Sequence, residues 1–388
     1  MSRAAQPYRE ATVTIVASEV MPTGGQERVL TKLVAGLLRR GHAVRVVARR
    51  CEVPERGDLR WTRIRAPKRP FALAYPWFAL AASLALRRVR EGVLHSTGAI
   101  VLNRVDLSTV HYCHRAFYSQ EAAPRRSRDS PAYRFNALIA KPLRLLGERW
   151  CYRRGRTRRL VPVSRGVAAE LRHQFPAMAH AVTVIPNGVD PRDFRSSPSL
   201  RSSARAELGI GDGSLMALFV GGDWERKGLR FAIEGVARTP DWRLMVVGDG
   251  DIRAFRQLAA EAGAFDRVTF VGRAGDPARF YAAADAFVFP TAYEAFPLVA
   301  LEAAASGLPL LAGRASGIED ILVPDENGWF VERDGAEIAA RLVQLGRDAD
   351  LRQQMGRAAA DASRDYTWDV VVERYLELYR ELAGNLPE

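Results

Sequence analysis

The sequence predicts an α/β protein with two doubly wound domains, each built on a parallel sheet. Its 388 residues exceed what one hydrophobic core usually serves. Two series of short apolar runs alternate with segments of helical periodicity. Residues 182–203 separate the two series and are rich in Pro, Ser and Gly, as a linker would be. We therefore expect domains at residues 1–190 and 191–365, followed by a C-terminal helix at residues 366–388.

The first series opens with a βαβ unit. Residues 11–20 form a β-branched run, a turn with Gly24 and Gly25 follows, and residues 28–42 have helical spacing. Residues 43–50 are predicted as the next strand, so the sheet should be parallel. Further strand-like runs lie at residues 92–98, 106–112 and 159–164, and a helical segment lies at residues 137–153.

The second series repeats this alternation. Strands are predicted at residues 214–222, 243–250, 267–273, 286–291 and 308–313. Helices are predicted at residues 228–237, 251–262, 278–284 and 298–306. Residues 366–383 have apolar side chains at helical spacing, which predicts a terminal amphipathic helix with a wide apolar face.

The charge of the chain is strongly positive and unevenly distributed. The formal net charge is +13, and arginine supplies almost all of the cations. Residues 115–159 hold thirteen Arg or Lys against three acidic residues. Such an excess indicates an anionic partner, which could be nucleic acid, a membrane surface or a phosphorylated substrate. Because the segment has no recognisable nucleic-acid-binding module, we expect no nucleic acid partner.

Cysteine use and hydropathy indicate a cytoplasmic protein. Cys51, Cys113 and Cys151 are odd in number and widely spaced, which argues against a disulfide framework or a zinc site. Residues 1–10 are polar and lack the pattern of a signal peptide. The longest apolar run, residues 71–86, contains Pro76 and is too short to span a bilayer. We expect no integral membrane segment.

One stretch, TAYEAFPLVALEAAASG at residues 291–307, carries two carboxylates, Glu294 and Glu302. Pro297 between them is a natural first helical residue, because it lacks an N–H and its φ is near the helical value. The amides of Leu298 and Val299 would then lie in the first turn, where they favour an anion. Glu302, in the second turn, could accept hydrogen bonds from a vicinal diol. The alternative is two solvated glutamates near a helix start.

Two further stretches indicate an anion site. FVGGDWERKG at residues 219–228 puts Arg226 and Lys227 at the end of a strand, where a doubly wound sheet binds ligands. A basic helix start without a ligand is the alternative, but cations oppose the helix dipole there. In TGGQER at residues 23–28, Gly24 and Gly25 would let the backbone approach a ligand closely, although glycine pairs are common at such turns.

Together these motifs resemble those of a known family. GGQERV, VPVS, VIPNGVD, GGDWERKG, VGDGD, VTFVGR and PTAYEAFPLVALEAAASGLPLL are similar to stretches of the retaining glycosyltransferases of family 4. The RKG element resembles the lipopolysaccharide-core glucosyltransferase branch. The resemblance covers most of the chain and is strongest over residues 182–329. It implies the GT-B fold, in which two Rossmann-like domains face a cleft and a C-terminal helix crosses back to the N-terminal domain.

The resemblance implies roles for residues of the donor site. Glu302 would bind the nucleotide ribose, and Glu294 would lie beside the donor sugar. Lys227 would neutralise the leaving pyrophosphate. The phosphate would be held by the backbone between the two glutamates, and the donor-binding stretch comprises Ala295, Phe296, Pro297, Leu298 and Val299.

Other positions carry over in the same way. Gly25, with Gly24 beside it, matches the glycine whose backbone nears the phosphates. Arg273 sits where the family places the base. His111 matches the active-site histidine beside the transferred sugar, with His114 as the second candidate. Both histidines could instead be ordinary loop residues.

The chain departs from the family at one point. The family often has an arginine directly after the VG of the strand, and this chain has Gly222 there. Arg226, beside Lys227, is therefore a candidate for the missing positive charge in the phosphate clamp.

We expect no metal and no other cofactor. DGD at residues 249–251 has the form of a metal-binding motif, but it follows a strand as a βα loop that the family uses without metal. The chain has no zinc spacing of Cys and His, no Walker loop and no G-x-S-x-G element. Cations and helix dipoles would instead stabilise a departing diphosphate.

The predicted activity is transfer of a hexosyl group, with retention of configuration, from a nucleotide diphosphate sugar to a glycan, glycolipid or lipid-linked saccharide. The resemblance favours a UDP-sugar, with a GDP-mannose-dependent mannosyltransferase as the alternative. A catalytically silent glycosyltransferase-like binding protein is a third possibility, but Glu302, Lys227 and His111 argue against it.

The acceptor is expected to dock on the N-terminal domain. The basic residues of 115–159 and the apolar stretch FALAYPWFALAASLAL suggest a surface for a phosphorylated lipid-linked saccharide or for anionic lipid headgroups at the inner face of a membrane. The alternative is a solvated basic helical face. The arginines concerned are Arg125, Arg126, Arg128, Arg134, Arg144, Arg153, Arg154, Arg156, Arg158 and Arg159.

Overall fold

The computed structural model describes residues 12–55, 57–119, 131–211 and 213–384, and the chain divides into two compact units. The first unit consists of Met1–Val163, Val167–Pro186 and Trp368–Glu388, and the second consists of Ser164–Gly166 and Asn187–Thr367. The predicted boundaries, after residues 190 and 365, lie within a few residues of these divisions. Each unit has its own sheet and its own core.

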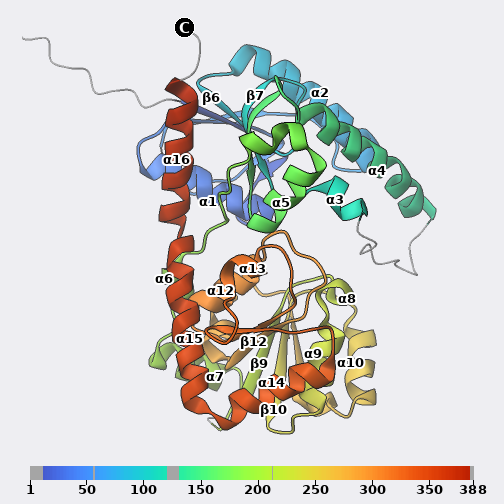
Figure 1. Ribbon diagram of the computed structural model, residues 1–388, viewed down its shortest axis with the longest axis vertical. Helices are drawn as coiled ribbons and strands as arrows, with labels where there is room; N and C mark the ends of the chain where they lie inside the picture. The colour runs from blue at the N-terminus through green and yellow to red at the C-terminus, as the bar shows by residue number, and fades with distance from the viewer. Residues whose placement is uncertain (1–11, 56, 120–130, 212, 385–388) are drawn as a thin grey trace, which may run out of the picture. The chain divides into compact units, whose positions relative to one another are not determined.

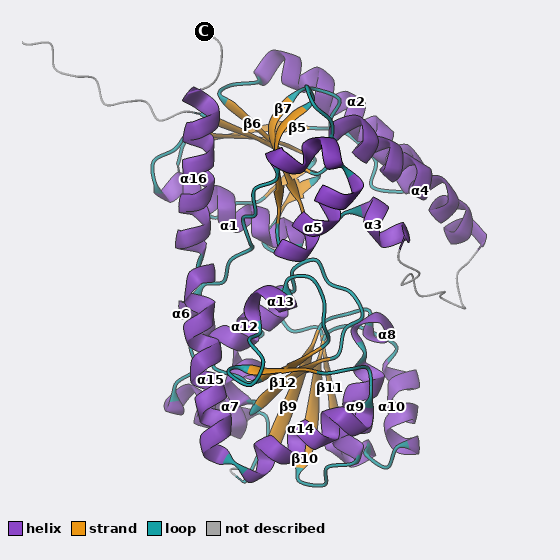
Figure 2. Ribbon diagram, viewed as in Figure 1, coloured by secondary structure: helices purple, strands orange, loops and turns teal. Residues whose placement is uncertain are grey.

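The first unit is built on a six-stranded parallel sheet with the order β5-β3-β1-β6-β7-β8. Apart from the edge strand β5, the strands are largely buried, because helices cover both faces of the sheet (Figure 2). The strand order reverses between β1 and β6, and ligands bind at the carboxyl ends of strands at such a point. The strands are β1 (Val13–Val16), β3 (Val44–Ala48), β5 (Leu59–Arg63), β6 (Val93–Thr97), β7 (Val105–Val110) and β8 (Thr157–Pro162).

Helices and two short strands complete this unit. Beyond β1 and β3 the chain continues as β2 (Glu19–Val20) and β4 (Arg50–Cys51), which pair with each other in parallel. The apolar run of residues 71–86 lies in one long helix, α2. The helices are α1 (Gln26–Arg39), α2 (Phe71–Val89), α3 (His114–Ser119), α4 (Pro131–Cys151), α5 (Arg165–Gln174), the 3-10 helix Pro176–Ala181 and α16 (Trp368–Gly384). The first residues of α5 lie in the segment assigned to the second unit.

The second unit repeats the same plan. Its parallel sheet has the order β11-β10-β9-β12-β13-β14, again with a reversal beside the first strand of the unit. The strands are β9 (Leu215–Val220), β10 (Trp242–Val247), β11 (Val268–Gly272), β12 (Ala286–Phe289), β13 (Leu310–Ala312) and β14 (Gly328–Phe330). The helices are α6 (Pro191–Phe194), α7 (Pro198–Glu207), α8 (Trp224–Lys227), α9 (Leu229–Ala237), α10 (Ile252–Glu261), α11 (Ala278–Ala283), α12 (Leu298–Ala305), α13 (Ile318–Ile321), α14 (Gly335–Arg347) and α15 (Ala349–Ser363).

The C-terminal helix α16 belongs to the first unit, as the resemblance implied. It packs beside α1, where Gly36 leaves room for Val372 (Figure 1). It is also joined to the sheet by buried polar contacts. His95 lies 2.7 Å from the hydroxyl of Tyr379 and 2.7 Å from that of Thr109. Because these polar side chains are buried, their mutual hydrogen bonds fix how the helix sits on β6 and β7.

The predicted linker at residues 182–203 is wrong in one respect, because it contains α6 and most of α7. Its polar and proline residues serve as helix starts. Asp190 accepts a hydrogen bond from the Arg192 amide, and Ser197 accepts one from the Leu200 amide, each just before a proline at the first helical position.

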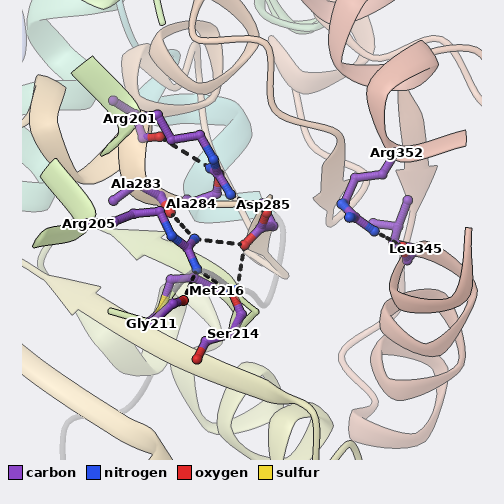
Figure 3. A network of polar contacts seen from close by, with 11 residues as sticks. Arg201, Arg205, Gly211, Ser214, Met216, Ala283, Ala284, Asp285, Leu345 and Arg352 are labelled. Atoms are coloured by element: carbon purple, nitrogen blue, oxygen red, sulfur yellow. Dashed lines mark hydrogen bonds and ion pairs between the residues drawn. The ribbon is translucent and has the colours of Figure 1, made fainter. Parts of the chain in front are cut away.

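A buried network of charged groups ties α7 to the second sheet (Figure 3). The carboxylate of Asp285 accepts hydrogen bonds from Arg201 at 2.6 Å, from Arg205 at 3.4 Å and from the Met216 amide at 2.8 Å. The Arg205 side chain is 4% exposed and also donates to the carbonyls of Ala283 and of two residues ahead of β9. The network lies at the amino ends of β9 and β12.

We expect the substitution Asp285→Ala to destabilise the second unit strongly. It would leave a buried guanidinium without its counter-charge, a change that costs about 3 kcal/mol or more. For a unit of this size the thermal midpoint should fall by about 6–12 °C. Calorimetry on the full chain measures the change, with Asp241→Ala, at an exposed position, as the matched control. A fall of less than 2 °C for Asp285→Ala would show that this network does not stabilise the second unit.

No helix in the described part of the chain combines the length and the hydropathy that a bilayer crossing requires. The helix α2, which contains the predicted apolar run, includes Pro76 and has Arg87 and Arg88 in its last turn. The three cysteines are free thiols, and burial raises the pKa of Cys113 to about 12.

Candidate functional site

The loop that follows β9 positions Lys227. Trp224, buried at the start of α8, donates a hydrogen bond from its indole to the Gly221 carbonyl at 2.8 Å. This contact folds the short helix α8 back over the end of the strand. Gly221 has φ of 135°, and a Cβ at this position would lie 2.5 Å from the Lys227 Nζ. Gly221 is therefore required both for the turn and for the place of the lysine.

Lys227 and Arg226 approach the same carboxylate, Glu294, in the loop that follows β12. Glu294 Oε1 lies 3.1 Å from Arg226 Nη1 and 3.7 Å from Lys227 Nζ. The Lys227 and Glu294 side chains are each 15% exposed. In the part of the chain that the structure describes, the Lys227 ammonium makes no hydrogen bond, so its three donors remain available to a ligand.

Arg226 makes more contacts than its neighbour. Its Nε donates to the Asp223 carboxylate at 3.0 Å, and its Nη1 also donates to the Tyr293 carbonyl. Burial disfavours the charged guanidinium, but Glu294 and Asp223 outweigh it, so the pKa of Arg226 lies above its usual value. Asp223 itself has φ of 53°, a left-handed conformation that is uncommon outside glycine. Arg226 thus bridges the loops after β9 and β12.

The helix between the two glutamates begins at Leu298, where the predicted helical segment of residues 298–306 also begins, and not at Pro297. Pro297 is the N-cap of α12, with ψ of 102°, and Leu298 is the first helical residue. Pro297 was expected to be that first residue. Its carbonyl accepts a hydrogen bond from the Ala300 amide at 3.1 Å. The amides of Leu298 and Val299 have no partner within the helix, and both residues are half-buried, so this helix start can receive an anion.

Glu302 lies in the second turn of α12 and is 4% exposed. The hydroxyl of Tyr281 donates to its Oε2 at 2.8 Å. Tyr281 is fully buried on α11 and packs edge-on against Phe194. The buried Tyr281 side chain thus holds the Glu302 carboxylate in one orientation. A carboxylate fixed in this way is suited to accept hydrogen bonds from the hydroxyl groups of a ligand.

Arg273 and the DGD loop lie apart from these contacts. The Arg273 guanidinium pairs with Asp249 at 2.5 Å, and its side chain is 83% exposed. Asp251 caps α10 by accepting a hydrogen bond from the Ala254 amide at 3.1 Å. Among the described residues, no group of three or more His, Cys, Asp or Glu has an arrangement that could hold a metal ion.

Two predicted site residues of the first unit lie at the start of α1. Gly24 has φ of 92°, and Gly25 is the N-cap of the helix without a side-chain cap. A Cβ added to Gly25 would meet no described atom within 4 Å. A Cβ added to Gly24 would instead clash with a carboxylate oxygen of Glu27, so the turn has free space at Gly25 and not at Gly24.

The structure separates the two candidate histidines. His111 directly follows β7, and its Nε2 is buried without a hydrogen-bond partner among the described residues. His114 instead begins α3, and both its amide and its Nδ1 contact Glu148, at 2.7 and 3.0 Å. The buried Glu148 carboxylate thus caps α3, which gives His114 a structural role. His111 remains the better candidate for a ligand contact.

The free energy of unfolding of the first unit should decrease as the pH is lowered below about 6.5, the usual pKa of histidine. Burial lowers the pKa of His95 to about 3 and that of His111 to about 4. The unfolded chain then binds more protons than the folded chain between these values and 6.5, so each histidine removes about 1.4 kcal/mol per pH unit as the pH falls. Thermal midpoints from pH 8 to pH 4 measure the slope. His95→Asn should reduce this slope by about half, whereas His173→Gln, at an exposed position, should leave it unchanged.

Several contributors to the site escaped prediction. Three residues support the site through their neighbours. Tyr281 orients Glu302, which is distant in sequence, while Asp223 and Gly221 lie in the turn that positions Arg226 and Lys227. The pair of glycines before α8 was a visible signal for Gly221, since such a pair often marks a turn with unusual φ. Nothing in the local pattern around Tyr281 pointed to Glu302.

Two family models match the chain. The model described as glycosyl transferases group 1 matches residues 201–362, which include Lys227, Glu294 and Glu302. The model described as glycosyltransferase family 4 matches residues 23–193, which include Gly24 and His111. Together the two matches cover most of the chain.

The chain is similar to known proteins over different shares of their length. It is 25% identical over 373 residues to an uncharacterized glycosyltransferase of Methanocaldococcus jannaschii, covering 91% of this chain and 94% of that protein. It is 31% identical over 252 residues to a D-inositol 3-phosphate glycosyltransferase of an Arthrobacter species, covering 59% of each. The chain thus spans less than two thirds of the second relative.

Solved structures share the fold. WaaG, a glycosyltransferase involved in lipopolysaccharide biosynthesis, superposes with a TM-score of 0.77 at 21% identity, covering 95% of this chain and 99% of that one. The Anabaena protein Alr3699/HepE in complex with UDP-glucose superposes with a TM-score of 0.72 at 18% identity, covering 97% and 100%. These likenesses confirm the predicted GT-B architecture.

Proposed function

Because the chain belongs to the glycosyltransferases of group 1 and family 4, we propose that it transfers a hexosyl group from a nucleotide diphosphate sugar to an acceptor hydroxyl. The observation that carries the proposal lies in the second unit. Lys227, Glu294 and the start of α12 follow the carboxyl ends of β9 and β12, and the buried Glu302 lies one turn along the helix. A cation and backbone amides without helical partners suit a diphosphate, and two carboxylates suit the hydroxyl groups on either side of it.

Each part of this arrangement has a task in the proposed reaction. The Lys227 ammonium and the amides of Leu298 and Val299 would bind the diphosphate and stabilise the charge that develops on it. The Glu302 carboxylate, oriented by Tyr281, would accept hydrogen bonds from the ribose hydroxyls. Glu294 would contact the hydroxyls of the transferred sugar, and His111 is kept as a candidate for a sugar contact.

We propose that the configuration at the anomeric carbon is retained and that no metal is needed. The bond between the anomeric carbon and the phosphate oxygen breaks, and the diphosphate leaves with the electron pair. The acceptor oxygen forms its bond on the same face, and its proton passes to the departing phosphate oxygen. Positive charge and helix amides can supply the electrostatic stabilisation for this departure.

UDP-glucose is the preferred donor in this proposal. The support is the similarity to the RKG element of the glucosyltransferase branch and to the fold of a protein solved with UDP-glucose. GDP-mannose remains the alternative.

A thermal-shift panel tests donor binding. UDP, GDP, ADP and their sugars are each added at the same concentration, and a ligand whose Kd lies a hundredfold below that concentration stabilises the folded state by about 2.7 kcal/mol. The unit that binds should then melt about 5–10 °C higher. A shift with UDP alone supports the donor preference, and a larger shift with GDP replaces it by GDP-mannose. If no diphosphate raises the melting temperature, the proposed function is wrong.

We further propose that the first unit contacts an anionic membrane through α2 and α4, which pack against each other (Figure 1). Four apolar side chains on α2 follow helical spacing and are each more than half exposed, and three more are exposed on α4. The first set is Leu73, Trp77, Leu80 and Leu84, and the second set is Leu138, Leu146 and Trp150. An exposed apolar stripe beside cations suits a lipid surface.

Arginines flank this stripe, but not all those predicted do so. The guanidinium groups of Arg153 and Arg156 lie 4.1 and 4.3 Å from the Trp150 ring centroid. Arg158 and Arg159 were wrongly included, because they pair with Asp106 and Glu381 and hold the end of α16. Arg125, Arg126 and Arg128 and the side chain of Arg134 lie outside the described residues.

Co-sedimentation with phosphatidylglycerol vesicles at low salt tests the membrane contact. The unaltered protein should sediment, and the double variant Trp77→Ser with Leu80→Ser should stay in solution. Phe265→Ser, which removes an apolar side chain of similar exposure in the second unit, is the matched control and should sediment normally. Equal sedimentation of the double variant, or none by the unaltered protein, would contradict the proposal.

A further inference from the structure

Glu294 has two cations within reach and is hydrogen-bonded to only one of them. The contact with Arg226 is a hydrogen bond at 3.1 Å, whereas Lys227 lies 3.7 Å from the same oxygen without forming one. Because these side chains are largely buried, their attraction is screened less than at a surface. The carboxylate is therefore a competitor for Lys227 against any anionic ligand.

Arg226 is held where it can satisfy this carboxylate. Its Nε donates to the Asp223 carboxylate in the loop after β9, and its Nη1 donates to the Tyr293 carbonyl in the loop that carries Glu294. Its own carbonyl accepts a hydrogen bond from the Ala292 amide at 3.0 Å. Side chain and backbone thus both tie Arg226 to the loop that carries Glu294.

We propose that Arg226 is a positioning residue that neutralises Glu294 and so leaves Lys227 available to the diphosphate of the donor. The proposal rests on the proposed function and replaces the expectation that Arg226 supplies the charge missing at Gly222. Without Arg226, Lys227 is the one remaining cation within 4 Å of Glu294 among the described residues, and the two would pair. The ammonium would then be less available to phosphate oxygens.

A direct phosphate contact is the competing role. Arg226 Nη2 makes no hydrogen bond among the described residues and could reach a ligand. The two roles differ in how Arg226 depends on Glu294. If Arg226 acts by neutralising Glu294, removing Arg226 should not weaken diphosphate binding once Glu294 has no charge. If Arg226 binds phosphate directly, its removal should weaken binding in either case.

A double-mutant cycle on the full chain distinguishes the two roles. The affinity for UDP, GDP and ADP is measured by calorimetry for the unaltered protein, Arg226→Ala, Glu294→Gln and the double variant. For the diphosphate that binds best, we expect Arg226→Ala to weaken binding about tenfold, as loss of one charge-assisted contact does. Glu294→Gln should not weaken it, and the double variant should bind within about threefold of Glu294→Gln.

Two outcomes overturn the proposal while the proposed function stands. One is a loss in the double variant as large as in Arg226→Ala, which indicates a direct phosphate contact. The other is an Arg226→Ala variant that binds as the unaltered protein does. Arg226→Gln provides a second variant that preserves volume, and Arg243→Ala, at the amino end of β10, is the matched control that should bind normally. If no diphosphate binds the unaltered protein, the proposed function fails, and this inference with it.

Discussion

Replacing Lys227 with alanine should lower kcat for the best sugar donor by about 10²–10³-fold. The ammonium lies beside Glu294 and over the ring of Phe289, 5.1 Å from its centroid, with its donors uncommitted. It would meet the diphosphate where negative charge develops as the glycosidic bond breaks. Release of nucleoside diphosphate from the donor measures the rate, and it needs no acceptor if slow hydrolysis is followed.

The control for this substitution is Arg243→Ala, which removes a cation at the opposite end of the second sheet. The Lys227→Ala variant should also keep its thermal midpoint, because the lysine makes no hydrogen bond among the described residues. A variant that folds and keeps its kcat within threefold would refute the role of Lys227.

Replacing Glu302 with alanine should raise the KM for the sugar donor about 10²-fold, with a smaller effect on kcat. The carboxylate would accept two hydrogen bonds from the ribose, and hydrogen bonds to charged groups contribute about 1.5–3 kcal/mol each. Glu302→Gln keeps the shape but loses the charge and should fall between the alanine variant and the unaltered protein.

Tyr281→Phe tests how much the orientation of the Glu302 carboxylate contributes, apart from the presence of the carboxylate itself. It removes only the hydroxyl that donates to Glu302 at 2.8 Å, so we expect a weaker effect on KM than that of Glu302→Ala. An unchanged KM in Glu302→Ala would remove the ribose assignment, whatever the result for Tyr281.

Much of the fold could be predicted because parallel strands buried on both faces appear as apolar runs. The runs at residues 214–222 and 286–291 contain β9 and β12, which are fully or nearly fully buried. The edge strands β5 and β14 were missed for the opposite reason. β5 is largely exposed, and β14 has three residues, so neither leaves a clear apolar pattern.

The helices of the predicted linker show a different limit. Proline and serine were interpreted as signs of irregular chain at residues 182–203, but Pro191 and Pro198 stand at the first positions of α6 and α7. What decides between the two interpretations is the buried pairing of Arg205 with Asp285, eighty residues apart. A contact at that separation has no local signal.

The candidate donor site could be predicted from the sequence where its residues lie in one stretch. Glu294, Pro297 and Glu302 are close in sequence, so the helix start and the second-turn carboxylate could be placed from spacing alone. Pro297 is the N-cap and not the first helical residue because its ψ is 102°, an extended value. Proline fixes φ but not ψ, so the sequence could not show this. The partnership of Arg226 with Glu294 depends on how two loops meet and required the structure.

We propose that this chain cleaves a nucleotide sugar with retention of anomeric configuration, through the residues around Lys227 and Glu302. Proton NMR of the sugar transferred to an acceptor, or released to water when none is present, tests it most directly. With UDP-glucose, which is α-linked, we expect a product that is α-configured when first formed, at a rate that falls in Lys227→Ala. A product that first appears in the β configuration, or no turnover of any donor in the panel by the folded protein, would contradict it.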